Sequence, residues 1–206
     1  MGTRAAKKPK PKRAYDAQET RRRILTVASG QFQSRGYHAT SMHDIMHLAS
    51  VPGGSMYHYF PTKKSLGLAV IRESVAGSIE ETWVAPMRSA PSASQGVQAV
   101  FLGVAEQIER DRNGVTGCPL NNLTMELSLA DPEFQTALRS IFDAWTSAVA
   151  DRIQQDIDER KLPKLDVKGT ATAVVAGFSG AMALAKAQQI TDPIRACARQ
   201  LRILFE

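Results

Sequence analysis

Residues 41–66 read SMHDIMHLASVPGGSMYHYFPTKKSL, and the turn-forming residues within them predict two short helices. Ser41 and Asp44 have the spacing of a helix N-cap and its acidic partner, so the first helix begins after Ser41. An apolar face that includes Ile45 follows. Val51-Pro52 ends this helix, because a proline disfavours helical backbone in the residue before it.

The second short helix follows a break at Pro52-Gly53-Gly54, which lets the chain turn sharply. This helix is expected to run to about Phe60. Pro61 then interrupts the chain, and a longer helix begins near Lys63. Two short helices joined by a tight turn indicate a helix-turn-helix, whose second member is the recognition helix.

A longer amphipathic helix precedes this pair. Asp16 and Glu19 have the spacing of a capping box, so the helix is expected to begin at Asp16, and Gly36 supplies its C-terminal stop. Apolar residues recur along it at helical spacing and give one apolar face. They are Ile24, Leu25, Ala28 and Phe32.

Positive charge is concentrated in the first third of the chain. Residues 1–64 hold 12 Lys and Arg against 3 Asp and Glu, a net charge of +9, and the remainder holds 14 against 17, a net charge of −3. Residues 1–15 lack apolar runs and alternate Lys with Pro, which predicts a disordered basic arm. Such an arm either follows a nucleic-acid backbone or is a non-specific tail. The charge segregation indicates a polyanion partner for the N-terminal part alone.

The chain after residue 65 is predicted to be helical throughout, which makes the fold class all-α. Pro86 is one of several expected breaks. Residues 133–160 carry the strongest amphipathic pattern. Residues 167–188 are rich in Ala and Gly and nearly apolar all round, so this helix is expected to be buried, in close contact with other helices within the chain or across a dimer.

Composition favours a soluble globular protein of one or two domains. The 206 residues are 43% hydrophobic and 22% charged. The two cysteines fit neither a disulfide framework nor a zinc cluster, which indicates a reducing compartment. No apolar segment of a signal peptide follows the basic N-terminus, and the apolar stretch 171–185 is shorter than a membrane span. We therefore expect a cytoplasmic protein without membrane contact.

Five motifs follow one another over residues 20–66: T-R-x-x-I-L-x-x-A, F-x-x-x-G-Y, T-S-M-x-D-I, A-S-V-P-x-G-S-M-Y-H-Y-F and K-K-S-L. In these motifs the sequence resembles the TetR-type transcriptional repressors. The resemblance implies about nine helices, with a three-helix helix-turn-helix DNA-binding domain over residues 16–64 and a larger helical ligand-binding and dimerisation domain over residues 65–206. It also implies a homodimer that binds a pseudo-palindromic, inverted-repeat operator in double-stranded DNA and is released by a small-molecule inducer.

A second resemblance covers residues 117–127, G-C-P-L-N-N-L-T-M-E-L. It is to a subgroup with the pattern G-C-x-x-x-x-L-x-x-E, some of whose members respond to electrophiles or oxidants through this cysteine. Cys118 is therefore a candidate sensor, and a position at a helix start would lower the pKa of its thiol. The alternative is a small buried side chain, the usual state of a free cysteine. Lys186 either approaches Cys118 or extends to the surface.

Three positions depart from the TetR pattern. Ser50 replaces the usual glycine of the turn, so a positive φ there costs more than it would with glycine. Gly53 stands where a basic residue is common, which removes one DNA contact. Met46 replaces a small residue and is expected to alter local packing only.

The resemblance also implies roles for residues of the helix-turn-helix. Thr40 and Ser41, at a helix N-terminus, are expected to meet a phosphate, with plain capping as the alternative. Base contacts are assigned to Gly54, Ser55 and His58, with His43 assisting. Backbone contacts are assigned to Tyr57, Tyr59 and Lys63, with a core position as the alternative for Tyr57. Additional salt-dependent affinity is assigned to Arg21, Arg22 and Arg23.

Candidate pocket residues in the larger domain are apolar, and each is equally suited to the core. They are Phe101, Val104, Met125, Trp145, Phe178 and Met182. No cofactor is predicted. His43 and His47 have a spacing that metals use, yet no cysteine lies near them and the glutamate of H-E-x-x-H is missing, so no metal site is predicted.

Two other functions compete with a repressor. A cysteine-dependent enzyme acting on electrophiles would need a base beside Cys118, and all four histidines lie in the N-terminal third. A non-specific DNA-binding protein would account for the basic arm but not for a domain large enough to hold a ligand.

Overall fold

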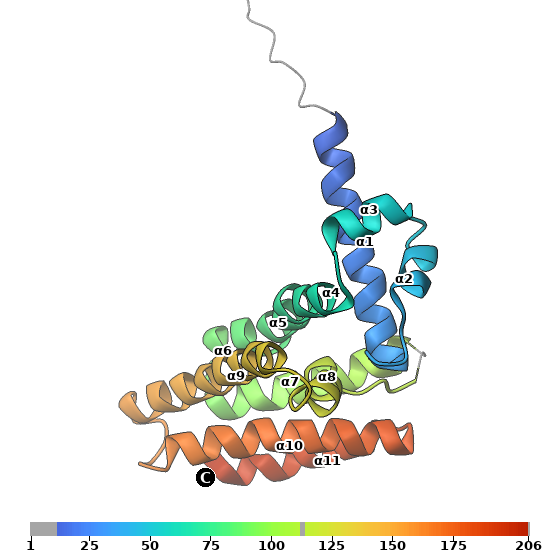
Figure 1. The fold of residues 1–206 in the computed structure, drawn as a ribbon. Coiled ribbons are helices and arrows are strands. Elements are labelled where there is room, and N and C mark those ends of the chain that lie inside the picture. Colours follow the sequence, from blue (N-terminus) through green and yellow to red (C-terminus); the bar gives the residue numbers. More distant parts are fainter. Residues whose placement is uncertain (1–11, 112–113, 206) are drawn as a thin grey trace, which may run out of the picture.

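A computed structural model describes residues 12–111 and 114–205, and every regular element within these ranges is a helix. The first three helices form a head at one end of the molecule, and the other helices form a body (Figure 1). The predicted all-α class is confirmed. Most of the predicted basic arm, residues 1–11, lies outside the described residues.

The head consists of α1 (Lys12–Arg35), α2 (Met42–Leu48) and α3 (Gly53–Tyr59). The predicted cap of α2 is confirmed, because the Ser41 hydroxyl accepts the Asp44 N–H at 3.0 Å and the Asp44 carboxylate accepts the Ser41 N–H at 3.1 Å. The predicted start of the first helix is wrong, since α1 already begins at Lys12. Lys, Arg and Ala directly after the last proline of the arm are good helix formers, and their propensity outweighs the capping signal at Asp16.

The apolar faces expected from the sequence meet in the head's core. Ile24, Phe32 and Ile45 are buried, and α1 contacts α3. Met56 and Phe60 anchor that helix, with at most 3% of either side chain exposed. Burial of these side chains fixes which face of α3 points outward.

One continuous helix leads from the head into the body, and the break expected at Pro86 does not occur. The turn immediately before Pro86 is a π-helix, which accommodates the backbone hydrogen bond that a proline cannot donate. Counted as one helix, this segment brings the described residues to nine helices. Its parts are α4 (Lys63–Ala69), η1 (Val70–Val75), α5 (Ala76–Ile79), η2 (Glu80–Val84) and α6 (Ala85–Ser89).

The rest of the body is built from five further helices. In Figure 1, α10 and α11 run side by side at the end of the molecule away from the head, and α10 packs against α9 and α11. The predicted amphipathic segment 133–160 corresponds to α9. The bounds are α7 (Ala93–Asp111), α8 (Pro119–Leu127), α9 (Pro132–Asp158), α10 (Val167–Gln188) and α11 (Asp192–Leu201), followed by the short η3 (Arg202–Phe205).

An aromatic cluster fills the centre of the body. The rings of Trp83, Phe101, Trp145 and Phe178 contact one another with centroids 4.9–5.7 Å apart. Most of these contacts are edge-on, the geometry that aromatic rings prefer. All four side chains are buried, so they form core rather than the wall of an open cavity.

Within one chain, the 167–188 helix is buried on one face only, so the expected burial by contacts within the chain alone is incomplete and burial across a dimer stays a prediction. One face of α10 packs on the core, and the opposite face is exposed and lined by small residues. That exposed stripe comprises Ala173, Ala176, Gly180, Ala183 and Ala187. Within residues 12–111 and 114–205, this stripe stays exposed.

By length and composition, α10 is long and apolar enough to cross a membrane, and among the described residues it alone meets that test. It has 22 residues, more than the apolar stretch 171–185, so the expectation of too short a segment is wrong. A core helix of a soluble protein passes the same test. The packing of α10 on α9 and α11 is what a core helix would show.

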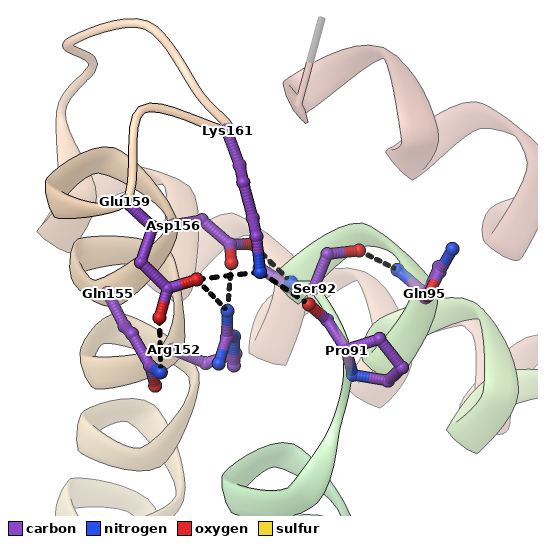
Figure 2. Close-up of polar contacts among 9 residues, drawn as sticks. Pro91, Ser92, Gln95, Arg152, Gln155, Asp156, Glu159 and Lys161 are labelled. Atoms are coloured by element: carbon purple, nitrogen blue, oxygen red, sulfur yellow. Dashed lines mark hydrogen bonds and ion pairs between the residues drawn. The ribbon is translucent and has the colours of Figure 1, made fainter.

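A buried polar cluster joins α9 to the start of α7 (Figure 2). Arg152 and Asp156 form an ion pair one helical turn apart, with 5% and 1% of their side chains exposed. The second carboxylate oxygen of Asp156 accepts the Ala93 N–H at 2.6 Å, in the first turn of α7. Lys161 closes the cluster by donating to the carbonyl of Pro91 and pairing with Glu159. A buried charge that is both paired and hydrogen-bonded ties the two helices together.

Candidate DNA-binding face and ligand pocket

The helix-turn-helix presents most of its predicted DNA-contacting residues to solvent. On α2, Ser41 and His43 are exposed. On α3, the outward side carries Gly54, Tyr57 and His58, opposite the buried Met56. With 55% of its side chain exposed, Tyr57 is not a core residue. Ser55 and Tyr59 are half-buried, and Tyr59 packs partly against the core.

Thr40 does not belong to this face. Its side chain is fully buried, and its hydroxyl donates to the carbonyl of Gly36 at 2.8 Å. Its backbone N–H donates to the carbonyl of Tyr37 at 3.2 Å. The expected phosphate contact of Thr40 is therefore wrong, because both of its donors already hold the turn between α1 and α2.

The departures from the family pattern have visible consequences. Ser50 has a φ of 51°, the left-handed conformation that glycine adopts at lower cost. Gly53 lies next to the Met46 side chain: a Cβ added at Gly53 would be 3.6 Å from the Met46 sulfur. Met46 therefore fills space beside the glycine, as a packing role requires.

Two of the predicted DNA-contacting cations are bonded to other groups of the protein. The Lys63 ammonium donates to the carbonyl of His38 at 3.2 Å and lies 4.4 Å from the centroid of the Tyr37 ring. Partial burial lowers the pKa of Lys63. Arg21 makes a two-fold hydrogen bond to Glu73 at 2.7 and 2.5 Å, so its charge is neutralised within the chain. In this conformation, both side chains already have partners within the protein.

The rings of His43 and His47 lie 6.0 Å apart on α2. Within the described ranges, no group of three His, Cys, Asp or Glu side chains is arranged to hold a metal ion. Both histidines are exposed. Their predicted role is still to lie on the surface or to face DNA.

A pocket of about 690 Å³ lies between α8 and α10 in the body. Three predicted ligand residues line it, namely Cys118, Met125 and Lys186. Its polar residues were not predicted from the sequence, and they bring hydrogen-bonding groups to a largely apolar hollow. The missed lining residues are Gly117, Asn121, Asn122, Thr124, Ser179, Ala183 and Ala187.

Cys118 is the N-cap residue of α8, as its flanking Gly and Pro suggested. Only 4% of the residue is exposed, and burial raises the pKa of its thiol. The nearby backbone N–H groups of Asn121 and Leu120 lower the pKa, but by less. The expected lowering at a helix start is therefore wrong for this conformation, because desolvation of the thiolate exceeds the effect of the helix end.

The other predicted ligand residues are not at this pocket. Phe101, Trp145 and Phe178 belong to the aromatic cluster, and Met182 is buried on the inner face of α10. Val104 lines a separate shallow hollow between α7 and the helix before it. Their apolar character predicted burial, but only the tertiary packing shows which of them border a cavity.

Hydrogen bonds connect the pocket to the head. The Gln33 amide of α1 donates to the carbonyl of Gly117 at 2.7 Å, and its oxygen accepts from Asn122 at 3.2 Å. Lys186 in turn donates to the Asn122 amide oxygen at 3.2 Å. Residues from α1, α8 and α10 thus form one polar chain along the edge of the pocket.

Glu126, at the other end of α8, contacts the head directly. Its two carboxylate oxygens accept the N–H groups of Tyr37 and His38, at 3.2 and 3.1 Å. The sequence analysis gave this residue no role, although it supplies the final letter of G-C-x-x-x-x-L-x-x-E. Its place as the carboxylate of that pattern could have marked Glu126 as a candidate functional residue.

Comparison with known sequences connects this geometry to a family. A profile described as "Bacterial regulatory proteins, tetR family" matches residues 24–70, which span the helix-turn-helix. A second profile, "Transcriptional regulator LmrA/YxaF-like, C-terminal domain", matches residues 93–200, more than half of the chain. The chain belongs to the TetR family. It is a DNA-binding transcriptional regulator of that family, and the helix-turn-helix predicted from residues 41–66 is confirmed.

Individual relatives are similar to this chain over nearly its whole length. The HTH-type regulator YxaF of Bacillus subtilis is 26% identical over 188 residues, which cover 90% of this chain and 95% of YxaF. The HTH-type transcriptional repressor DhaR of Mycobacterium sp. (strain GP1) is 24% identical, with 90% of each chain covered. The crystal structure of a TetR regulator from Chloroflexus aurantiacus superposes with a TM-score of 0.79 at 25% identity, covering 92% of this chain and 95% of that one.

Proposed function

We propose that this TetR-family regulator is a ligand-responsive repressor that binds an inverted-repeat operator as a homodimer and is released when a small molecule occupies the pocket between α8 and α10. The observation that supports this function is the 690 Å³ pocket, whose wall residues Gly117 and Asn122 are hydrogen-bonded to Gln33 of the DNA-binding head. A ligand that changes this contact would favour one position of the head over another, and would thereby change operator affinity by linkage.

The proposed DNA contacts come from the exposed side of α2 and α3. Ser41 is suited to a phosphate, since its hydroxyl still has a proton to donate while its oxygen caps α2. His43 and His58 are exposed and can bond base edges, and Gly54 lets the backbone come close. Ser55 is a further base-reading candidate, and Tyr57 and Tyr59 are candidates for the phosphate backbone.

The homodimer is proposed to form through α10 and α11. The exposed stripe of small residues on α10 permits close approach of another helix, and Leu184 beside it is 55% exposed. Ile203, after α11, is 62% exposed. A two-fold dimer through this face would place two recognition helices in successive major grooves of the operator.

The proposed inducer is an electrophile or oxidant that reacts at Cys118. The resemblance of residues 117–126 to the electrophile-responsive pattern supports this, as does the position of Cys118 on the pocket wall. Because the thiol is buried and its pKa is raised, the reaction requires the pocket to open first. The competing enzymatic function gains no support, since the residues lining this pocket include no histidine or carboxylate to act as a base. We place the regulator in the cytoplasm.

Selection of genomic fragments bound by the protein tests this function and identifies the operator. We expect an inverted repeat bound with nanomolar Kd, weakened steeply by salt because phosphate contacts release counterions. Treatment with a thiol-reactive electrophile should release the wild type, whereas Cys118→Ser should bind the operator equally well and resist release. Sequence-independent micromolar binding would refute the repressor, and normal release of Cys118→Ser would refute the cysteine sensor.

A further inference from the structure

We propose that Glu126 is the positioning residue through which the α8–α10 pocket controls the DNA-binding head. This inference rests on the proposed function of that pocket as the inducer site. The Glu126 carboxylate, and the turn of residues 36–38 that it holds, would transmit occupancy of the pocket to the head.

The contact is specific in its geometry. Each oxygen of Glu126 accepts one of two successive backbone N–H groups, from Tyr37 at 3.2 Å and His38 at 3.1 Å. Both N–H groups belong to the turn between α1 and α2, and the cap of α2 follows at Ser41. A shift of the carboxylate therefore moves the start of a helix that is expected to meet DNA.

The turn is shaped to receive this carboxylate. Gly36 has a φ of +91°, and a Cβ at this position would lie 2.8 Å from Oε1 of Glu126. Any other residue would strain the backbone, and its Cβ would force the carboxylate to shift from its present position. The glycine that ends α1 thus also permits the close approach of α8.

The helix that carries Glu126 is also a wall of the pocket. With only nine residues, α8 is short enough to move as one unit. Cys118 caps its start, and Met125, which directly precedes Glu126, lines the pocket. A group that enlarges the pocket at Cys118 would displace α8 and with it the carboxylate.

A positive charge on the other side of the turn makes the contact dependent on the charge of Glu126. The Lys63 ammonium donates to the carbonyl of His38 at 3.2 Å. The charge of Glu126 acts on Lys63 and opposes the effect of burial on that ammonium. Ammonium and carboxylate thus both bond the backbone of His38, the ammonium at its carbonyl and the carboxylate at its N–H. Glutamine at position 126 would keep one acceptor, lose the charge and present an N–H₂ group to a backbone N–H.

An ion-pair contact between α4 and the start of α9, next to the head, serves as a matched control. Lys64 of α4 pairs with Glu133 at 2.6 Å and with Asp131 at 2.6 Å, at the start of α9. Like Glu126, Glu133 is a carboxylate that joins the body to a residue beside the head. It lies on a different helix and does not line the pocket, so Glu133→Gln should not affect the signal.

The test is hydrogen exchange at the N–H groups of residues 37 and 38, measured without DNA in a Cys197→Ser background. The pocket is altered in two ways: methyl methanethiosulfonate adds a thiomethyl group to Cys118, verified by mass, and Cys118→Met introduces a similar shape genetically. Each alteration is made in the wild-type, Glu126→Gln and Glu133→Gln proteins, and thermal midpoints confirm folding.

We expect either alteration to accelerate exchange at residues 37 and 38 by about fivefold or more in the wild type and in Glu133→Gln, the effect of losing roughly one hydrogen bond. In Glu126→Gln, exchange should already be fast and change by less than about twofold. Unchanged exchange in the wild type, or an equal response in Glu126→Gln, would overturn the proposal. Because no DNA is present, failure of operator binding would count against the proposed function alone.

Discussion

The backbone conformation of Ser50, in the turn between α2 and α3, lowers the stability of the protein. Its φ of 51° lies in the left-handed region, where a side chain is disfavoured. We expect Ser50→Gly to raise the free energy of unfolding by about 1 kcal/mol, because relief of this strain exceeds the added flexibility of the unfolded chain. Urea denaturation measures the change. A loss of stability would show that the Ser50 side chain makes a favourable interaction that outweighs the strain.

Cys118 illustrates at the same scale how burial and helix position compete. The raised pKa of its thiol means that the reactive thiolate forms only at higher pH than in a free cysteine. In a Cys197→Ser protein, the rate of alkylation should therefore rise with pH to a midpoint above that of a cysteine peptide. A midpoint below that of the peptide would show that the thiol is activated rather than suppressed in the resting protein.

At the scale of elements, the contact between α4 and the head depends on a missing side chain. A Cβ on Gly67 would lie 2.7 Å from the Tyr37 ring and 3.1 Å from the Phe134 ring of α9. We expect Gly67→Ala to lower the free energy of unfolding by about 1–3 kcal/mol, because these rings cannot both withdraw. Thermal and urea unfolding measure this loss.

Gly77→Ala is the control for that prediction, since it lies on the same continuous helix and a Cβ there meets nothing within 4 Å. It should be neutral or stabilising by up to about 1 kcal/mol. Equal behaviour of the two variants would show that α4 and the head are not packed against each other as described.

Short-range signals predicted the elements, and their failures are informative. The capping hydrogen bonds between Ser41 and Asp44 lie within one helical turn, so the local sequence is sufficient to predict them. The start of α1 was missed because helix propensity before Asp16 prevailed over a cap signal. Pro86 was expected to break the helix, but a π-helical turn absorbs it.

For the whole molecule, the limit of sequence reasoning is contact between distant segments. Glu126 and His38 are 88 residues apart, and no local pattern connects them. Apolar residues such as Phe101 and Trp145 satisfy the same pattern in a core as beside a ligand, and packing placed them in the core. The helix-turn-helix could be predicted because its motifs are local, whereas the pocket required the fold.

The proposed homodimer joins two DNA-binding heads to two pockets that control their affinity for the operator. Fluorescence anisotropy titration of the selected operator tests this proposal most directly, with a duplex in which one half-site is scrambled as the control. We predict one dimer per inverted repeat with nanomolar Kd, a loss of at least about tenfold on scrambling, and a similar loss after thiomethylation of Cys118. Equal affinity for both duplexes, together with no effect of thiomethylation, would contradict the account.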